Sequence, residues 1–208
     1  LERERVLKLY AIETSSKYFD LKVAGIDEAG RGPLAGPVYA AAVILPPGLF
    51  ISGLNDSKKV SAKRREELAC TIKANAISWA IGLASVEEIE YLNILKASHL
   101  AMTRALEAMQ IKPDHILVDG NITPDFKYPV TPITGGDGKS ACIAAASILA
   151  KVERDNAMNS LAKKYPQYGF SNHKGYATVE HYEAIYKYGI TSVHRQSFLK
   201  VFIEREYG

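Results

Sequence analysis

The sequence has few of the residues that mark several common protein classes. Its 208 residues include two cysteines and five histidines, and neither cysteine belongs to a Cys-x-x-Cys pair. A disulfide framework and a zinc site are therefore not expected. No apolar run approaches the roughly 18 residues of a membrane span, and the charged first residues are unlike a secretory signal. We expect a cytoplasmic protein without membrane attachment, in which Cys70 and Cys142 are buried thiols.

Charge is present but nearly balanced. The net charge is +3, with 24% charged and 47% apolar residues, which is enough for one ordinary core and argues against wholesale disorder. So small a basic excess fits solvated helix faces as well as a polyanionic partner. A cationic rim around an acidic site would favour the polyanion, because such a rim attracts a phosphodiester backbone.

Apolar runs and helical periodicity divide the chain into alternating strands and helices. Strands are expected at 22–27, 38–45, 78–84, 115–118 and 128–133. Helices are expected at 1–19, 61–75, 85–109, 139–162, 178–188 and 197–206. Ser61 is a good N-cap, and Ser85 with Glu88 forms a capping box. Interleaved strands and helices predict an α/β fold, a mixed sheet with helices on its faces.

Four acids share one property, since each lies where an apolar or glycine-rich run stops. They are Asp27, Glu28, Asp119 and Asp137. Carboxylates that converge at strand ends repel one another by several kcal/mol unless a counterion is present. All-oxygen ligands favour Mg²⁺ or Mn²⁺, and two such ions would support phosphoryl transfer. Each acid taken singly is also compatible with an N-cap or an exposed turn.

Adjacent residues of a regular strand point to opposite faces. Asp27 and Glu28 can therefore share a metal only if the strand bends, and Gly30 and Gly32 make a bend possible. The other acids considered are interpreted as turn or solvated helix residues: Asp20, Asp56, Asp114, Asp125 and Asp155.

Several residues outside the acids are candidates for nucleic-acid contact. Gly30 and Gly32 leave backbone groups open to a ligand, and Arg31 between them supplies a cation suited to phosphate. Ser57 and Lys58 lie in a polar loop that offers a hydroxyl and an ammonium group to phosphates. A tight turn and a solvated loop are the simpler interpretations of these two segments. Further phosphate-contact candidates are Lys139, Ser140, Lys151, Arg154, Lys174 and Arg195.

The histidines are not expected to be metal ligands. His99 and His115 are interpreted as structural, because one lies in a helix and the other begins a strand. His173 and His194 are loop residues that are candidates for a place near the substrate.

The motif Asp-Glu-Ala-Gly-Arg-Gly-Pro-Leu-Ala-Gly-Pro-Val at 27–38 resembles the N-terminal signature of bacterial ribonuclease HII. The resemblance continues in order through 54–59, Val-Asp-Gly at 118–120, Gly136-Asp137, the small-residue segment at 143–152 and His-Lys-Gly-Tyr-Ala-Thr at 173–178. It covers essentially the whole chain. The related ribonuclease HIII type differs, since Ala29 and Arg31 stand here where that type has valine and threonine.

The resemblance implies a ribonuclease H-like fold, with a central mixed five-stranded sheet, flanking helices and a small helical C-terminal part. Residues 1–162 would form the catalytic core and 163–208 a helical region that contributes substrate contacts. The activity implied is metal-dependent cleavage of the RNA strand of RNA–DNA hybrids. It includes nicking of duplex DNA on the 5′ side of a single ribonucleotide, with 3′-hydroxyl and 5′-phosphate products.

The resemblance also assigns individual residues. It makes Asp27, Glu28, Asp119 and Asp137 the ligands of two divalent ions. It places the substrate 2′-hydroxyl on the backbone of Gly30-Arg31-Gly32 and a sugar against Tyr176. Without the motif, Tyr176 would be an ordinary surface or core tyrosine.

A monomer acting on RNA–DNA hybrid and ribonucleotide-containing duplex DNA is the resulting expectation. One alternative is another two-metal nuclease, of the junction-resolvase or exonuclease type. A non-catalytic nucleic-acid-binding module is a further alternative, against which the retention of all four acids argues.

Overall fold

The computed structural model describes residues 1–121 and 124–200 of the chain. Its five strands are β1 (Val23–Ala29), β2 (Val38–Ile44), β3 (Ser78–Ala84), β4 (His115–Asp119) and β5 (Val130–Ile133). The α-helices in these residues are α1 (Glu2–Lys8), α2 (Ala62–Asn75), α3 (Val86–Leu92), α4 (Ile94–Ala108), α5 (Ala141–Lys164), α6 (Phe170–His173) and α7 (Val179–Tyr188). The expected five-stranded mixed sheet with helices is confirmed.

The sheet has the strand order β3-β2-β1-β4-β5. β1 pairs with β2, and β2 with β3, in antiparallel fashion, whereas β4 runs parallel to both β1 and β5. Because β1 and β4 are parallel neighbours, their carboxyl ends reach the same edge of the sheet. That edge receives Asp27 near the end of β1 and Asp119 at the end of β4.

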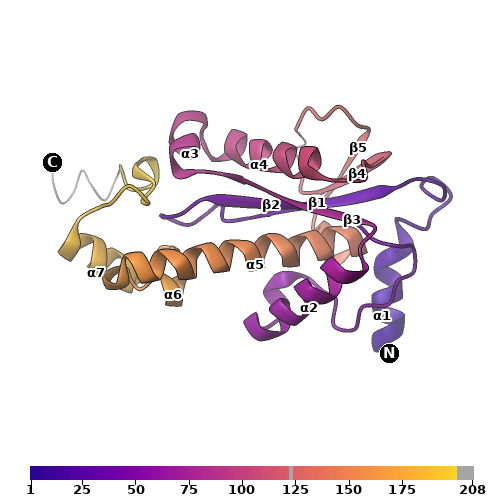
Figure 1. Ribbon diagram of the computed structural model, residues 1–208, viewed down its shortest axis with the longest axis horizontal. Coiled ribbons are helices and arrows are strands. Elements are labelled where there is room, and N and C mark those ends of the chain that lie inside the picture. The colour runs from indigo at the N-terminus through magenta and orange to yellow at the C-terminus, as the bar shows by residue number, and fades with distance from the viewer. Residues whose placement is uncertain (122–123, 201–208) are drawn as a thin grey trace.

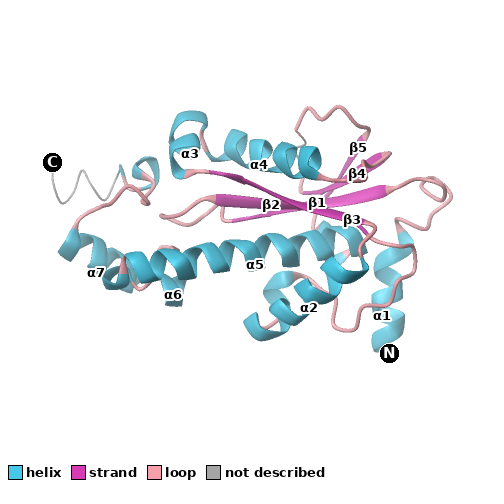
Figure 2. Cartoon of the chain, viewed as in Figure 1, coloured by secondary structure: helices cyan, strands magenta, loops and turns pink. Residues whose placement is uncertain are grey.

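Helices cover both faces of the sheet (Figures 1 and 2). α3 and α4 lie on one face, and α5 with α2 and α1 lies on the other. Two apolar clusters fill the layers, one between the sheet and α4 and one between the sheet and α5. α6 and α7 pack around the far end of α5, where a third cluster joins them to Leu34 and Ala35.

Helix α5 lies unusually close to β1, and glycine makes this possible. A Cβ atom built on Gly25 would lie 2.1 Å from the backbone carbon of Cys142, closer than atoms can approach. The run Ala144-Ala145-Ala146 in the same helix is fully buried. The expected small-residue segment is thus the packing face of α5, and it brings the helix against the strand that carries Asp27.

Two expected helices are shorter or divided. The first ends at Lys8, with a 3₁₀ turn at Leu9–Ala11, and turns follow. The Thr14 hydroxyl there donates to the Tyr10 carbonyl, as such side chains do when they compete with helical bonding. The helix expected at 85–109 breaks at Asn93, which has φ 70° and caps α4 with its side-chain oxygen.

Three other expectations concern burial, the C-terminal end and membranes. Cys142 is buried, but Cys70 is exposed, because it lies on the face of α2 opposite the buried Leu68, Ala69 and Ile72. The helix expected at 197–206 lies mostly outside the described residues, whose last element is a 3₁₀ turn at Gln196–Phe198. In the described part of the chain, no helix combines the length and apolarity needed to cross a membrane.

Candidate active site

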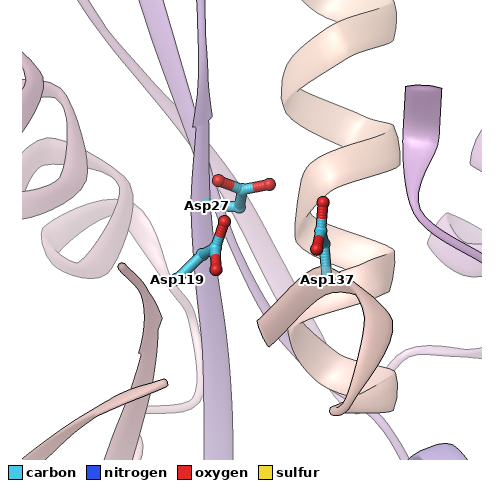
Figure 3. A group of neighbouring side chains, drawn as sticks. All are labelled: Asp27, Asp119 and Asp137. Carbon is cyan, nitrogen blue, oxygen red and sulfur yellow. The ribbon is translucent and has the colours of Figure 1, made fainter. Parts of the chain in front are cut away.

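Three of the four candidate acids meet at the carboxyl edge of the sheet (Figure 3). Asp27 comes from β1, Asp119 from β4 and Asp137 from a 3₁₀ turn (Gly136–Gly138) just before α5. One carboxylate oxygen from each of the three lies within 4.8 Å of the others. We call this group the aspartate cluster. Its members come from three separate segments of the chain.

Glu28 is not part of the aspartate cluster, because β1 continues regularly to Ala29. The bend that would turn both acids to one side does not occur. Asp27 therefore faces α5, as Gly25 does, whereas Glu28 faces α4 with Ile26. Glu28 lines a small cavity of about 70 Å³ there, together with Asp119. Asp119 thus adjoins both carboxylates of β1.

Burial and mutual repulsion hold the acids in an unfavourable state. Burial raises the pKa of Asp27 well above its ordinary value, and the charges of Glu28 and Asp119 raise it further. Burial also raises the pKa of Glu28, which the Arg31 guanidinium opposes. The pKa of Asp137 is raised by burial and then by the charges of Asp56 and Asp119. These shifts have the sign expected for carboxylates that are buried close to one another.

Backbone and hydroxyl donors orient the cluster. The Glu28 N–H donates to Asp27 Oδ1 at 2.7 Å, and the Gly136 N–H donates to Asp119 Oδ1 at 2.6 Å. Ser147 of α5 lies near the Asp27 side chain and opposes the rise of its pKa. The Ser147 hydroxyl donates to the Ser57 hydroxyl, 2.8 Å away.

Ser57 and Lys58 differ in what they face. Ser57 is buried, and its hydroxyl is directed to Ser147 rather than to solvent. Lys58 is exposed, and its Nζ lies 3.7 Å from Asp137 Oδ2. The two neighbours therefore support the aspartate cluster from inside and from its rim, respectively.

Asp56 was interpreted from the sequence as a turn residue, but it lies beside the cluster. After burial, the charge of its carboxylate is the largest cause of the raised pKa of Asp137. Asp56 also accepts a hydrogen bond from the Lys58 N–H and so caps the 3₁₀ turn Ser57–Lys59. Ser147 and Asp56 both lie in motifs that carry the family resemblance, but a single sequence does not show which motif residues face a site.

Two glycines of the loop after β1, Gly30 and Gly32, lie in different surroundings. Gly30 has φ 103°, and a Cβ there would lie 2.2 Å from Nε of Arg154. It is therefore glycine because of the loop conformation and the buried arginine, not because a ligand needs the space. Gly32 faces outward, and among the described residues a Cβ there would meet only the Tyr176 ring, at 4.0 Å. Gly32 and the half-exposed Tyr176 are thus neighbours at the surface.

Cations around this loop occupy two environments. Arg31 is at the surface, where its Nη1 lies 3.3 Å from Glu28 Oε1. Arg154 and Arg195 are completely buried, so they are not surface phosphate contacts. Ser140 is also completely buried, and it caps α5 while donating to Glu13.

His194 is buried in the C-terminal part and does not face solvent. Its Nδ1 accepts from the Thr191 N–H, and its Nε2 lies 3.3 Å from Nε2 of His181. His181 Nδ1 is bonded to the Tyr176 carbonyl at 2.9 Å. His181 and His194 are therefore internal supports of the segment that carries Tyr176.

An all-oxygen cluster of carboxylates that repel one another can be relieved by a hard divalent cation. Two parallel strands and a 3₁₀ turn carry this cluster at the edge of a mixed five-stranded sheet between helical layers, which is the arrangement expected of a metal-dependent nuclease with the ribonuclease H-like fold.

The family model for ribonuclease HII matches residues 24–201. The chain is 58% identical over 198 residues to ribonuclease HII of Moorella thermoacetica, covering 95% of this chain and 96% of the relative. It is 56% identical over 176 residues to ribonuclease HII of Idiomarina loihiensis, covering 85% and 94%. The crystal structure of ribonuclease H2 from Pyrococcus horikoshii OT3 matches with a TM-score of 0.73 at 28% identity, covering 88% and 97%.

This chain belongs to the ribonuclease HII family. It is accordingly a ribonuclease H endonuclease, which hydrolyses the RNA strand of RNA–DNA hybrids and nicks duplex DNA at embedded ribonucleotides. The family assignment decides against the alternatives of a junction resolvase, an exonuclease or a non-catalytic module.

Proposed function

We propose that Asp27, Glu28, Asp119 and Asp137 together hold two divalent ions, Mg²⁺ or Mn²⁺. The observation that carries this proposal is the convergence of three carboxylates within 4.8 Å. The raised pKa values of Asp27, Glu28 and Asp137 support it, because a divalent cation would offset the cost of keeping these carboxylates charged. The donor set contains only oxygen, which suits these two metals better than zinc or copper.

When bound, such ions would activate a water molecule and stabilise the leaving 3′ oxygen of the cleaved strand. The protein's part is to keep the carboxylates in place before the substrate arrives. The N–H groups of Glu28 and Gly136 do so for Asp27 and Asp119. We assign Ser57 to the same task, through its contact with Ser147, and Lys58 to the phosphate backbone next to Asp137.

The surface beside the cluster is proposed to recognise the ribonucleotide. A 2′-hydroxyl is the group that distinguishes RNA from DNA at a single position, and it is both donor and acceptor. The backbone of Gly30, Arg31 and Gly32 would bind it, while the Tyr176 ring packs against a sugar. The contact of Tyr176 with the Gly32 position supports this placement. Cleavage would then fall on the 5′ side of the ribonucleotide.

Residues 1–162 are proposed to form the catalytic core, with 163–208 contributing substrate contacts. Tyr176 belongs to the second region, and its support by His181 favours this division. We further propose that the protein acts as a monomer. The exposed free thiol of Cys70 favours a reducing compartment such as the cytoplasm.

The test is cleavage of two duplexes of identical sequence, one with a single ribonucleotide and one all-DNA. The wild type should nick only the first, on the 5′ side, and only with Mg²⁺ or Mn²⁺. Asp119→Asn should lose more than about a hundredfold in rate, since it weakens metal-ion stabilisation worth several kcal/mol. Asp114→Asn, an exposed acid paired with Lys22, is the matched control and should retain activity. Equal cleavage of both duplexes would refute ribonucleotide recognition, and an active Asp119→Asn would refute the metal assignment.

A further inference from the structure

Arg195 is a completely buried cation that binds the loop 30–37 through carbonyl groups. Its Nη2 donates to the Gly30 carbonyl at 2.7 Å, and its Nη1 donates to the Arg31 carbonyl at 3.0 Å. Nε and Nη2 both donate to the Gly36 carbonyl, at 2.9 and 2.7 Å. The planar guanidinium thus donates hydrogen bonds to two consecutive carbonyl groups and to a third carbonyl on the far side of the same loop.

Hydrogen bonds to two consecutive carbonyls also fix the directions of the two N–H groups that follow them. The peptide unit is planar and trans, so an N–H points away from the carbonyl of the preceding residue. With the Gly30 and Arg31 carbonyls directed at Arg195, the N–H groups of Arg31 and Gly32 are directed away from it. Within residues 1–121 and 124–200, neither N–H donates to a protein acceptor. Consecutive free N–H groups form a site for an electron-rich oxygen.

The electrostatics of Arg195 argue against a purely structural role. No carboxylate of the described residues forms an ion pair with its guanidinium, whose hydrogen bonds all go to backbone carbonyls, and the charge of Glu90 acts on it from farther away. Burial and the neighbouring charge of Arg154 lower the pKa of Arg195 to about 9, which leaves it cationic at neutral pH. Burying an unpaired charge is costly, and an apolar residue would fill the same volume with less penalty. The cost is understandable if the guanidinium serves recognition.

Arg154 completes the arrangement from α5. Its Nη2 donates to the carbonyls of Ala35 and Lys174, and its guanidinium lies 5.6 Å from the centre of the Tyr176 ring. Its side chain occupies the space that the missing Cβ of Gly30 leaves. The loop and the tyrosine are therefore tied to one another through a single buried side chain.

We propose that Arg195 is a positioning residue for ribonucleotide recognition, because its guanidinium aims the N–H groups of Arg31 and Gly32 at the substrate. The substrate atom to which they donate is the oxygen of the ribonucleotide's 2′-hydroxyl. This inference rests on the proposed function of the loop, and it adds a distant residue whose effect is on selectivity rather than on the metal chemistry.

The experiment measures selectivity in binding. Affinities are determined for the single-ribonucleotide duplex and the all-DNA duplex of the same sequence, in Ca²⁺, after confirming that no cleavage occurs. Arg195→Lys keeps the charge but lacks the planar fork that grips two carbonyls. We expect its preference for the ribonucleotide duplex to fall at least tenfold, while its affinity for all-DNA stays within about threefold of wild type. Arg104→Lys, at a surface arginine that binds Glu88 and the Leu83 carbonyl, is the matched control.

Each outcome is decisive. A folded Arg195→Lys that keeps the wild-type preference overturns the inference. A wild type without any preference instead overturns the proposed function of the loop. If Arg195→Lys does not fold, Phe198→Leu takes its place, because the Phe198 ring lies 5.2 Å from the Arg195 guanidinium. That milder variant should lose part of the preference, and an unchanged preference there also overturns the inference.

Discussion

Replacement of Asp27 by Asn should make the metal-free protein more stable while it abolishes cleavage. The carboxylate oxygens of the aspartate cluster lie within 4.8 Å of one another. At an effective dielectric constant of about 20, each charged pair at that distance repels by about 3.5 kcal/mol. Asp27 takes part in two of the three pairs. Asn keeps an oxygen to accept the Glu28 N–H, and its amide can donate to a neighbouring carboxylate.

The measured gain should be smaller than the sum of two repulsions, because the cluster already reduces its charge by binding protons. Burial and the neighbouring charges raise the pKa of Asp27, so the folded metal-free protein binds more protons than the unfolded chain. Wild-type stability therefore falls as the pH rises through the window above 3.8. The gain from Asn should be largest at neutral pH, roughly 2 kcal/mol, and should vanish at low pH, where the carboxyl group is neutral in both states.

The assay is thermal unfolding in EDTA and in excess Mg²⁺. For a chain of this size, about 2 kcal/mol corresponds to an increase in Tm of roughly 4–8 °C. Mg²⁺ should stabilise the wild type, because it binds only the folded state, and should stabilise Asp27→Asn much less. Asp20→Asn, an exposed acid near the opposite end of β1, should leave Tm nearly unchanged. A destabilised Asp27→Asn in EDTA would refute the account of the cluster as mutually repelling charges.

Two further predictions concern the support of the site. Burial lowers the pKa values of His181 and His194 to about 4. Between pH 6.5 and 4 the unfolded chain therefore binds more protons than the folded protein. The free energy of unfolding should fall as the pH drops through that window. Urea unfolding at several pH values should show a shallower fall for His194→Gln than for the wild type, and identical slopes would contradict this. Gly25→Ala should cost about 3 kcal/mol or more, since its Cβ would overlap the Cys142 backbone, whereas Gly138→Ala has open space and should cost little. Chemical denaturation measures both, and equal stabilities would exclude the close packing of α5 on β1.

Local signals in the sequence were enough for most of the fold. The third strand has the observed bounds, and the capping residues Ser61 and Ser85 stand where their helices begin. These features depend on neighbouring residues only, which is why a single sequence contains them. Asn93 shows the limit, because the periodicity of 85–109 continues across the break. Only the left-handed conformation of one residue divides the helix.

The sequence predicted which acids belong to the candidate site, but not how these acids are arranged in space. The position of Asp27 and Asp119 at strand ends follows from apolar runs that stop, and parallel pairing then brings them together. Alternation along β1 places Glu28 on the other face, which the sequence left open through a possible bend. The place of Asp56 next to Asp137 depends on how two loops pack, and no local pattern contains that information.

The short segment from Asp27 to Gly32 explains how the recognised ribonucleotide and the cleaved bond can be kept at a fixed distance from each other. Under the proposed roles, one short segment carries a metal-binding acid at its start and the N–H groups that test for a 2′-hydroxyl at its end. The sheet register holds the first of these, through pairing of Asp27 with Ala41. Arg195 holds the second, through the carbonyls of Gly30 and Arg31. Because both ends are anchored to rigid parts, the distance from the recognised sugar to the cut is a property of the backbone. A flexible loop with the same sequence would lose that coupling, even with every catalytic side chain present.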